Sequence, residues 1–203
     1  SSSGNNKNIK ELSNLSYLHL SGNYYLVDPS FSIASSVINY INLAATNLPI
    51  PNLAGKTQLQ TAYMHYMRSN GGLFTGNTYK FNNCTALETL YLYATGVGGA
   101  FPRFTNPNLN YLEMRYTNVS GGYKDGSTVD NTHAISENTF RDCVKLKTFY
   151  VISGNLLTAP IAQNTFTFTP ALQRLLYRSN GRTTGAIPNL NSCSDLRYLN
   201  LYY

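Results

Sequence analysis

The sequence predicts an α/β-type solenoid: a right-handed coil with one parallel, concave sheet of about eight short strands and little helix on its convex side. Three observations lead to this prediction. A short apolar pattern recurs eight times, Asn or Thr often follows it at a constant distance, and the segments between copies are rich in Gly, Pro, Asn and Thr. Such a repeat is typical of architectures in which each unit buries its apolar face only against its neighbours.

The recurring pattern has apolar residues at its first, fourth and sixth positions, as in Leu15, Leu18 and Leu20. Alternate side chains of an extended segment point to opposite faces, so the fourth and sixth positions share an inward face. Each copy is therefore expected to form one strand that pairs in parallel with the next copy. The eight copies begin at Leu15, Ile38, Leu59, Leu87, Leu109, Leu146, Leu172 and Leu196.

Polar residues recur three positions after the third apolar residue of a copy. Thr46, Thr95 and Thr117 are examples, and Asn23 and Asn180 occupy the same position. Backbone groups that leave a buried strand need a hydrogen-bond partner. We expect these side chains to bond the backbone where the chain turns away from the strand.

The repeats organise the chain into a flanking segment, residues 1–11, and a single array, residues 12–203. The last copy has only just begun where the sequence stops, so we expect the array to continue beyond residue 203. The two longest intervals between copies predict inserted loops near residues 68–80 and 121–138. Insertions in repeat proteins often lie on a binding side. Sequence drift without a function is an equal alternative.

Three cysteines occupy equivalent positions, each three residues before a first apolar position: Cys84, Cys143 and Cys193. Residues separated by two coils lie roughly 10 Å apart, whereas a disulfide needs Cα atoms within about 7 Å. The sequence therefore predicts three buried, unpaired thiols that pack as small apolar groups.

Several function classes are disfavoured. The chain has no apolar run long enough for a membrane span, so no membrane insertion is expected. His19, His65 and His133 lack metal-ligand spacing, and no catalytic motif is present. We therefore expect no enzyme activity, no metal and no cofactor, and we interpret Glu88 and Glu113 as solvent-facing acids rather than a catalytic pair. The net charge of +6 is modest and no nucleic-acid motif occurs, so a nucleic-acid partner is not expected.

Tyrosine is concentrated on the face of the strands that points away from the core. Of the 17 tyrosines, 12 fall on or beside this face. Tyrosine offers a flat apolar ring with a hydroxyl at its rim, which suits sugar rings and protein surfaces. The alternative is that these rings only pack along the sheet. The candidate ligand-binding residues are Tyr17, Tyr40, Tyr63, His65, Tyr91, Tyr93, Tyr111, Arg115, Tyr150 and Arg178.

The repeat pattern resembles that of leucine-rich repeat proteins, and Phe81-Asn-Asn-Cys84 and Phe140-Arg-Asp-Cys143 resemble the F-x-x-C-x-x-L segments of that family. Residues 82–92 and 189–201 are similar to leucine-rich repeat stretches in large structural or tail-associated proteins of marine bacteriophages that infect cyanobacteria. The resemblance implies a non-enzymatic virion component, assembled in the host cytoplasm and exposed on the virion surface or outside the cell. Its expected partners are a protein or glycan of the host surface and other virion subunits.

Two alternatives stay open. The array could be purely architectural and contact only other virion subunits. It could also be a segment of a secreted bacterial cell-surface adhesin, because such adhesins use similar repeats.

Overall fold

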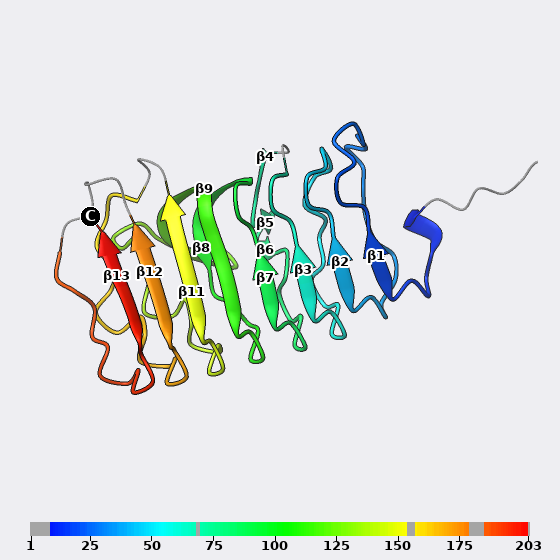
Figure 1. Ribbon diagram of the computed structural model, residues 1–203. Coiled ribbons are helices and arrows are strands. Elements are labelled where there is room, and N and C mark those ends of the chain that lie inside the picture. The colour runs from blue at the N-terminus through cyan, green and yellow to red at the C-terminus, as the bar shows by residue number, and fades with distance from the viewer. Residues whose placement is uncertain (1–8, 68–69, 154–156, 179–184, 203) are drawn as a thin grey trace, which may run out of the picture.

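The computed structural model describes residues 9–67, 70–153, 157–178 and 185–202. They form a parallel β-solenoid of about seven turns with nearly no helix (Figure 1). Within these ranges, the 3-10 turn η1 (Ile9–Glu11) is the only helical element. The predicted parallel solenoid with little helix is confirmed. The α/β part of the expectation finds no support, because turns and short strands make up the side opposite the main sheet.

The main sheet contains eight parallel strands that are neighbours in the order β1-β2-β3-β7-β9-β11-β12-β13. Each strand starts two residues after the first apolar position of one copy. The bounds are β1 Tyr17–His19, β2 Tyr40–Asn42, β3 Thr61–Tyr63, β7 Thr89–Tyr91, β9 Tyr111–Asp125, β11 Thr148–Ser153, β12 Arg174–Arg178 and β13 Tyr198–Tyr202.

The register aligns the apolar pattern from coil to coil. Leu18 of β1 pairs with Ile41 of β2, which in turn pairs with Ala62 of β3. These central residues are buried, while the residues on either side of them point outward and are half-buried or exposed. The strands form here because one coil alone cannot bury its apolar residues, and stacking at the strand spacing buries them continuously.

The chain leaves the strands of the first five coils through a left-handed backbone turn. The turn residue has a positive φ, at equivalent positions in these coils: Gly22 (80°), Ala45 (55°), Tyr66 (54°), Ala94 (50°) and Tyr116 (56°). A left-handed conformation suits glycine and costs other residues about 1–2 kcal/mol. The stacked coils therefore impose the same turn on residues that do not favour it.

The polar residue that follows this turn donates a side-chain hydrogen bond to a backbone carbonyl at the end of the preceding strand. The hydroxyl of Thr46 donates to the carbonyl of Leu43 at 2.7 Å, and the hydroxyl of Thr95 donates to that of Leu92 at 2.9 Å. Thr117 makes the same bond. The predicted role of these side chains is confirmed for the three threonines and for Asn23, whose Nδ2 donates to the carbonyl of Leu20 at 2.7 Å. Asn180 lies outside the described residues.

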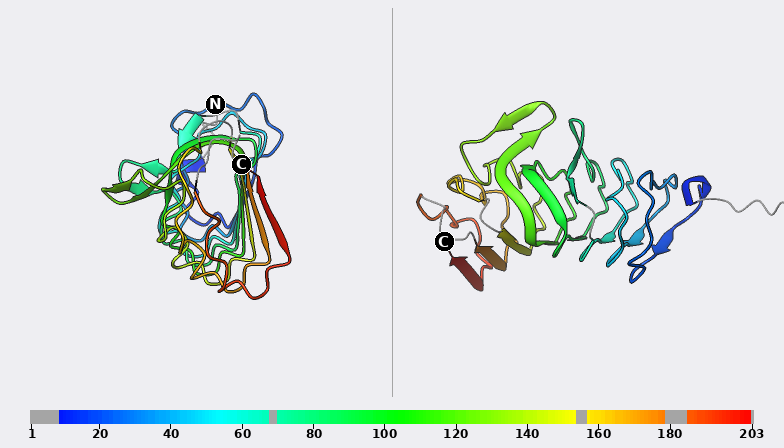
Figure 2. Two further views of the ribbon diagram at one scale, coloured as in Figure 1. Left: turned by 90° about the vertical axis from the view of Figure 1, so that its left-hand side faces the viewer. Right: turned by 90° about the horizontal axis from the view of Figure 1, so that it is seen from above.

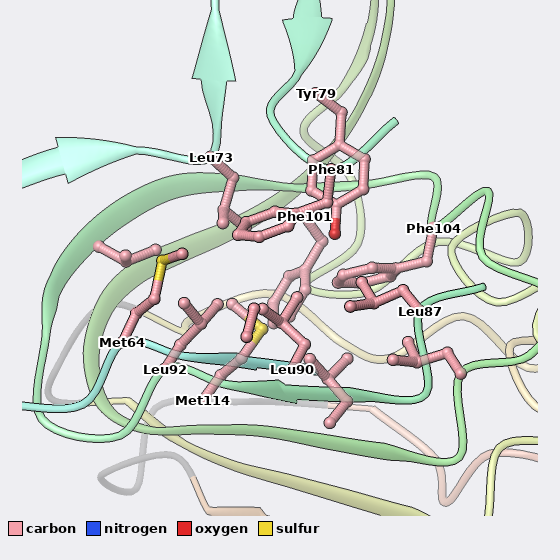
Figure 3. Close-up of a cluster of buried hydrophobic side chains, with 14 of the residues drawn as sticks. Met64, Leu73, Tyr79, Phe81, Leu87, Leu90, Leu92, Phe101, Phe104 and Met114 are labelled. Atoms are coloured by element: carbon pink, nitrogen blue, oxygen red, sulfur yellow. The ribbon is translucent and has the colours of Figure 1, made fainter. Parts of the chain in front are cut away.

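The core runs the length of the solenoid inside the coils, and Figure 3 shows its middle part. A row of phenylalanines stacks from coil to coil opposite the main sheet. The rings of Phe104 and Phe140 lie 5.6 Å apart and nearly parallel, and Phe140 continues the stack to Phe166 at 5.9 Å. All three side chains are fully buried.

The three cysteines are buried and unpaired, as predicted. They also act as hydrogen-bond donors, which the sequence analysis did not anticipate: the thiol of Cys84 donates to the Leu53 carbonyl at 3.1 Å, and that of Cys143 to the Phe104 carbonyl at 3.3 Å. In other coils Asn106 and Thr169 occupy the same position and also donate to a backbone carbonyl. Burial raises the pKa of Cys84 to about 11 and that of Cys143 to about 12.

A second, smaller sheet interrupts the regular coils. Its strands are β4 (Asn70–Gly72), β8 (Gly96–Pro102), the second half of β9 and the antiparallel β10 (Thr128–Asp130). β9 is long because it passes from the main sheet into this one. Within the second half of β9, at the register shift opposite β8, Gly121 has a φ of +81°, and a Cβ there would lie 3.0 Å from the Cα of Ala134.

Two hairpins project from the same side of the coil stack (Figure 2, left). One joins β5 (Phe74–Thr75) to β6 (Thr78–Tyr79), and the other joins β9 to β10. They touch: Nζ of Lys124 donates to the carbonyl of Gly76 at 3.0 Å and lies 4.8 Å from the Phe74 ring centre. The hairpins fall in the ranges where inserted loops were expected, of which residues 68–69 lie outside the described chain.

No helix in the described parts of the chain is both long enough and apolar enough to cross a membrane.

Candidate functional site

The main sheet presents one continuous surface away from the core, here named the outer face. It consists of the side chains on either side of each buried strand centre and those of the residues that follow the strands. The ten candidate residues all lie on it: Tyr17 on β1, Tyr40 on β2, Tyr63 on β3, Tyr91 on β7, Tyr111 and Arg115 on β9, Tyr150 on β11 and Arg178 on β12, with His65 and Tyr93 just after β3 and β7. Whether this face is concave stays a prediction.

Aromatic rings form an unbroken ladder across the outer face. Tyr17 and Tyr40 stack at 4.4 Å with 7° between their planes, and Tyr91 and Tyr111 stack at 5.9 Å with 16°. The other neighbours meet edge to face at 6.0–6.4 Å. Each strand of the main sheet except β12 contributes one ring, in the order Tyr17, Tyr40, Tyr63, Tyr91, Tyr111, Tyr150 and Tyr198.

The ladder is more accessible at its ends than in its middle. Tyr17 is 54% exposed and Tyr198 is 44% exposed, whereas the rings between them are half-buried against one another. Packed aromatic pairs contribute about 0.5–1.5 kcal/mol beyond their burial. The ladder thus stabilises the sheet, and its middle presents ring edges and hydroxyls rather than whole ring faces.

Glu113 lies under this ladder and is fully buried. Its carboxylate accepts a hydrogen bond of 2.5 Å from Nε of Arg115 and another from the Tyr111 hydroxyl. The expectation that Glu113 faces solvent is therefore wrong. The physical reason is its register: it sits between Tyr91 of β7 and Tyr150 of β11, and large rings flank it on both sides.

Arg115 is not a freely available cation. Its guanidinium pairs with Glu113 and lies 5.3 Å from the Tyr93 ring centre and 5.5 Å from that of Tyr150. Arg178 also lies over a ring, that of Tyr202, at 5.0 Å. The positive charge of Arg115 is already paired with the buried carboxylate of Glu113. Arg115 therefore attracts an anionic partner less strongly than its position in the sequence predicts.

His65 contributes an aromatic ring to the outer face. It meets Tyr91 edge to face at 5.1 Å and Tyr66 at 5.6 Å. Burial lowers its pKa, although the negative charge of Glu113 opposes this shift. Its Nδ1 is buried with no hydrogen-bond partner in the described structure. The side chain is therefore neutral near neutral pH.

Three tyrosines form a separate group at the edge of the outer face where the chain turns away from the main sheet, here named the rim triad: Tyr66, Tyr93 and Tyr116. Tyr93 meets Tyr66 at 5.1 Å and Tyr116 at 5.4 Å, and each pair is nearly perpendicular, at 82° and 86°. Tyr66 is 53% exposed and Tyr116 is 56% exposed. An open hollow of about 480 Å³ adjoins Tyr66 and is lined by Tyr24, Tyr66, Met67 and Ala94.

The sequence analysis did not select Tyr66 and Tyr116 as candidate binding residues. A signal for them exists in the repeat alignment, where the other described coils with this left-handed turn have Gly22, Ala45 or Ala94 at the same position. A large aromatic residue in a column of small ones marks a position whose side chain does more than the turn requires.

A second hollow, of about 390 Å³, lies on the outer face between Tyr63, Thr89, Tyr91, Asn110 and Tyr111. Both hollows are open and are lined by tyrosine rings; the second also has the Thr89 hydroxyl and the Asn110 amide in its lining, whereas the first has the apolar side chains of Met67 and Ala94. Among the described residues, no group of three His, Cys, Asp or Glu side chains could hold a metal ion. The arrangement is suited to an extended contact with another molecule.

Comparison with known proteins finds no family model and no curated protein that matches the chain.

Proposed function

We propose that the protein is a non-enzymatic recognition module of the leucine-rich repeat type, exposed on the virion surface of a bacteriophage that infects cyanobacteria, as part of its tail or fibres. It binds a protein or glycan of the host surface through the outer face. The leucine-rich repeat assignment is supported by the eight apolar repeats and the solenoid they build. The phage assignment is supported by the resemblance of residues 82–92 and 189–201 to phage repeat proteins.

The observation that carries the binding proposal is the aromatic ladder. Seven rings from Tyr17 to Tyr198 cross the sheet without a gap, and a hollow of about 390 Å³ opens beside the middle ones. Tyrosine is enriched where proteins bind other molecules, because its rigid ring gives a large contact area at a low cost in side-chain entropy. A surface of this length favours an elongated ligand over a small molecule held in a deep pocket.

The proposal is tested by the binding of the labelled 203-residue chain to intact cyanobacterial cells. Replacement of Tyr63 and Tyr91 by alanine removes two central rings and should weaken binding at least about tenfold. Tyr17→Ala, which removes an exposed end ring, serves as a second variant in case the central pair destabilises the sheet. Phe168→Ala is the matched control, because Phe168 is exposed on a turn outside the main sheet.

Unchanged cell binding by folded variants of both kinds would exclude the outer face as the contact surface. Equal losses with Phe168→Ala would mean that the tyrosine variants act through general destabilisation.

A further inference from the structure

Two members of the rim triad, Tyr66 and Tyr116, are large residues at turn positions that do not require a large side chain. Tyr66 and Tyr116 occupy left-handed turns with φ of 54° and 56°. Non-glycine residues in such conformations cost about 1–3 kcal/mol and gather at functional sites. Gly22 and Ala45 make the same turn in other coils, so the turn needs no large side chain.

Neither tyrosine recovers this cost by burial in the core. Both are more than half exposed, unlike the tyrosines in the middle of the ladder, which are half-buried. Exposed aromatic rings in a fixed arrangement are instead suited to contact a ligand.

Three consecutive coils hold the triad in place. Tyr66 follows β3, Tyr93 follows β7 and Tyr116 lies within β9, and the backbone amide of Tyr66 donates to the carbonyl of Tyr93 at 2.9 Å. A hydrogen bond between the Tyr66 and Tyr93 side chains, together with desolvation, raises the pKa of Tyr93. The three rings therefore have a defined mutual geometry before any ligand arrives, which lowers the entropy cost of binding.

The charges around the triad favour an uncharged ligand. Among the described side chains whose rings or cationic groups contact these three rings, Arg115 is the charged one, and Glu113 compensates its charge. A cationic ligand is disfavoured because the guanidinium of Arg115 already lies over Tyr93, 5.3 Å from its ring centre. An anionic ligand would meet a cation whose charge is already paired.

We propose that the rim triad and the adjoining hollow form a subsite for a neutral sugar residue of a surface glycan. The apolar faces of a sugar ring pack on tyrosine rings, and its hydroxyls exchange hydrogen bonds with the tyrosine hydroxyls. The hollow of about 480 Å³ lies in the size range of small-ligand sites. This inference rests on the proposed function, because it names the ligand class and the subsite of the same surface.

The key variant replaces Tyr66 and Tyr116 by glycine. Glycine adopts the left-handed conformation readily, so this variant loses two rings and keeps the turns unstrained. Ala45→Gly is the control for the backbone change, since Ala45 makes the same turn without a ring. Phe168→Ala is the control for the loss of an exposed ring, because Phe168 is 42% exposed on a turn outside the main sheet.

The probes are immobilised neutral oligosaccharides, with sulfated and sialylated oligosaccharides as acidic probes. We expect the unmodified chain to bind a neutral oligosaccharide, with a Kd that changes less than about twofold between 0.1 and 0.5 M NaCl, because contacts with an uncharged ligand are not screened by salt. The double glycine variant should bind at least about tenfold more weakly. Both controls should stay within about twofold of the unmodified chain.

Neutral-glycan binding that survives in the double glycine variant would overturn the subsite, and so would binding confined to the acidic probes. If the chain binds cells only through a protease-sensitive receptor and no glycan, the sugar inference fails while the proposed function stands. If it binds neither cells nor glycans, both fail.

Discussion

Arg115 reaches back two residues along β9 and donates from Nε to the carboxylate of Glu113 at 2.5 Å, in the middle of the outer face. Glu113 is fully buried while the Arg115 side chain is 31% exposed. The negative charge of Glu113 is thus buried beneath the tyrosine ladder, while the positive charge of Arg115 lies partly exposed on the outer face.

This pair predicts that Glu113 contributes to stability. Glu113→Ala leaves Arg115 and the Tyr111 hydroxyl without their acceptor, and we expect the free energy of unfolding to fall by about 2 kcal/mol in denaturant titrations. The partial exposure of Arg115 lets water compensate part of the loss. Glu88→Ala is the control, because Glu88 is exposed and should change stability by less than about 0.5 kcal/mol. Equal effects of the two substitutions would contradict the buried-pair interpretation.

The left-handed turns predict a difference between two alanines in one repeat. Ala94 has a φ of 50°, and Ala86, in the turn before the same strand, has no positive φ. Ala94→Gly should leave the free energy of unfolding unchanged or raise it, because relief of the backbone offsets the greater freedom of glycine in the unfolded chain. Ala86→Gly should lower it by about 0.5–1 kcal/mol. Thermal unfolding of the two variants side by side checks this, and a larger loss at position 94 would count against the turn geometry.

The buried thiols predict that stability falls in alkaline solution. Burial raises the pKa of Cys84 to about 11 and that of Cys143 to about 12, whereas a thiol in an unfolded chain has a pKa of about 8.5. Above that value the unfolded chain releases thiol protons that the native chain retains. The free energy of unfolding therefore decreases as pH rises, by up to about 1.4 kcal/mol per pH unit for each thiol.

Denaturant titrations between pH 8 and 10 measure this slope. With both Cys84 and Cys143 replaced by alanine, the slope should become shallower whatever the change in absolute stability. Thr169→Ala is the matched control, since Thr169 occupies the same column without an ionisable group. A double variant with the original slope would show that these thiols do not titrate as their burial implies.

The phenylalanine stack predicts a large effect at Phe140, which is fully buried between Phe104 and Phe166. Phe140→Ala should cost about 3–5 kcal/mol, because it leaves a cavity that the stacked coils cannot close. Phe168→Ala, at a site 42% exposed, should cost less than about 1 kcal/mol. Near-ultraviolet circular dichroism and denaturant titrations distinguish the two, and similar small losses at both sites would contradict the continuous core.

The apolar pattern was enough to locate the strands of the main sheet. Leu18, Leu90 and Leu175 lie at buried strand centres, as the spacing predicted, because the inward and outward alternation of a strand is a local property. The threonines at the strand ends were predicted for the same reason, since their partner is a carbonyl only three residues away.

The second sheet could not be predicted from the pattern. β4, β8 and the end of β9 are rich in glycine and lack the apolar spacing of the repeat. They pair because successive coils place these segments next to one another, a proximity that no local signal reports. Gly121 lets the chain pass close to Ala134 at the register shift between β8 and β9.

The order of the coils, the inward apolar residues and the outward tyrosines could be predicted from the sequence alone, because each depends on residues a few positions apart. The burial of Glu113, the pairing of Arg115 and the grouping of Tyr66 with Tyr93 and Tyr116 arose only when separate coils came into register. The exposure of an outward side chain depends on what stands on the neighbouring strands, and those neighbours come from more than twenty residues away in the chain.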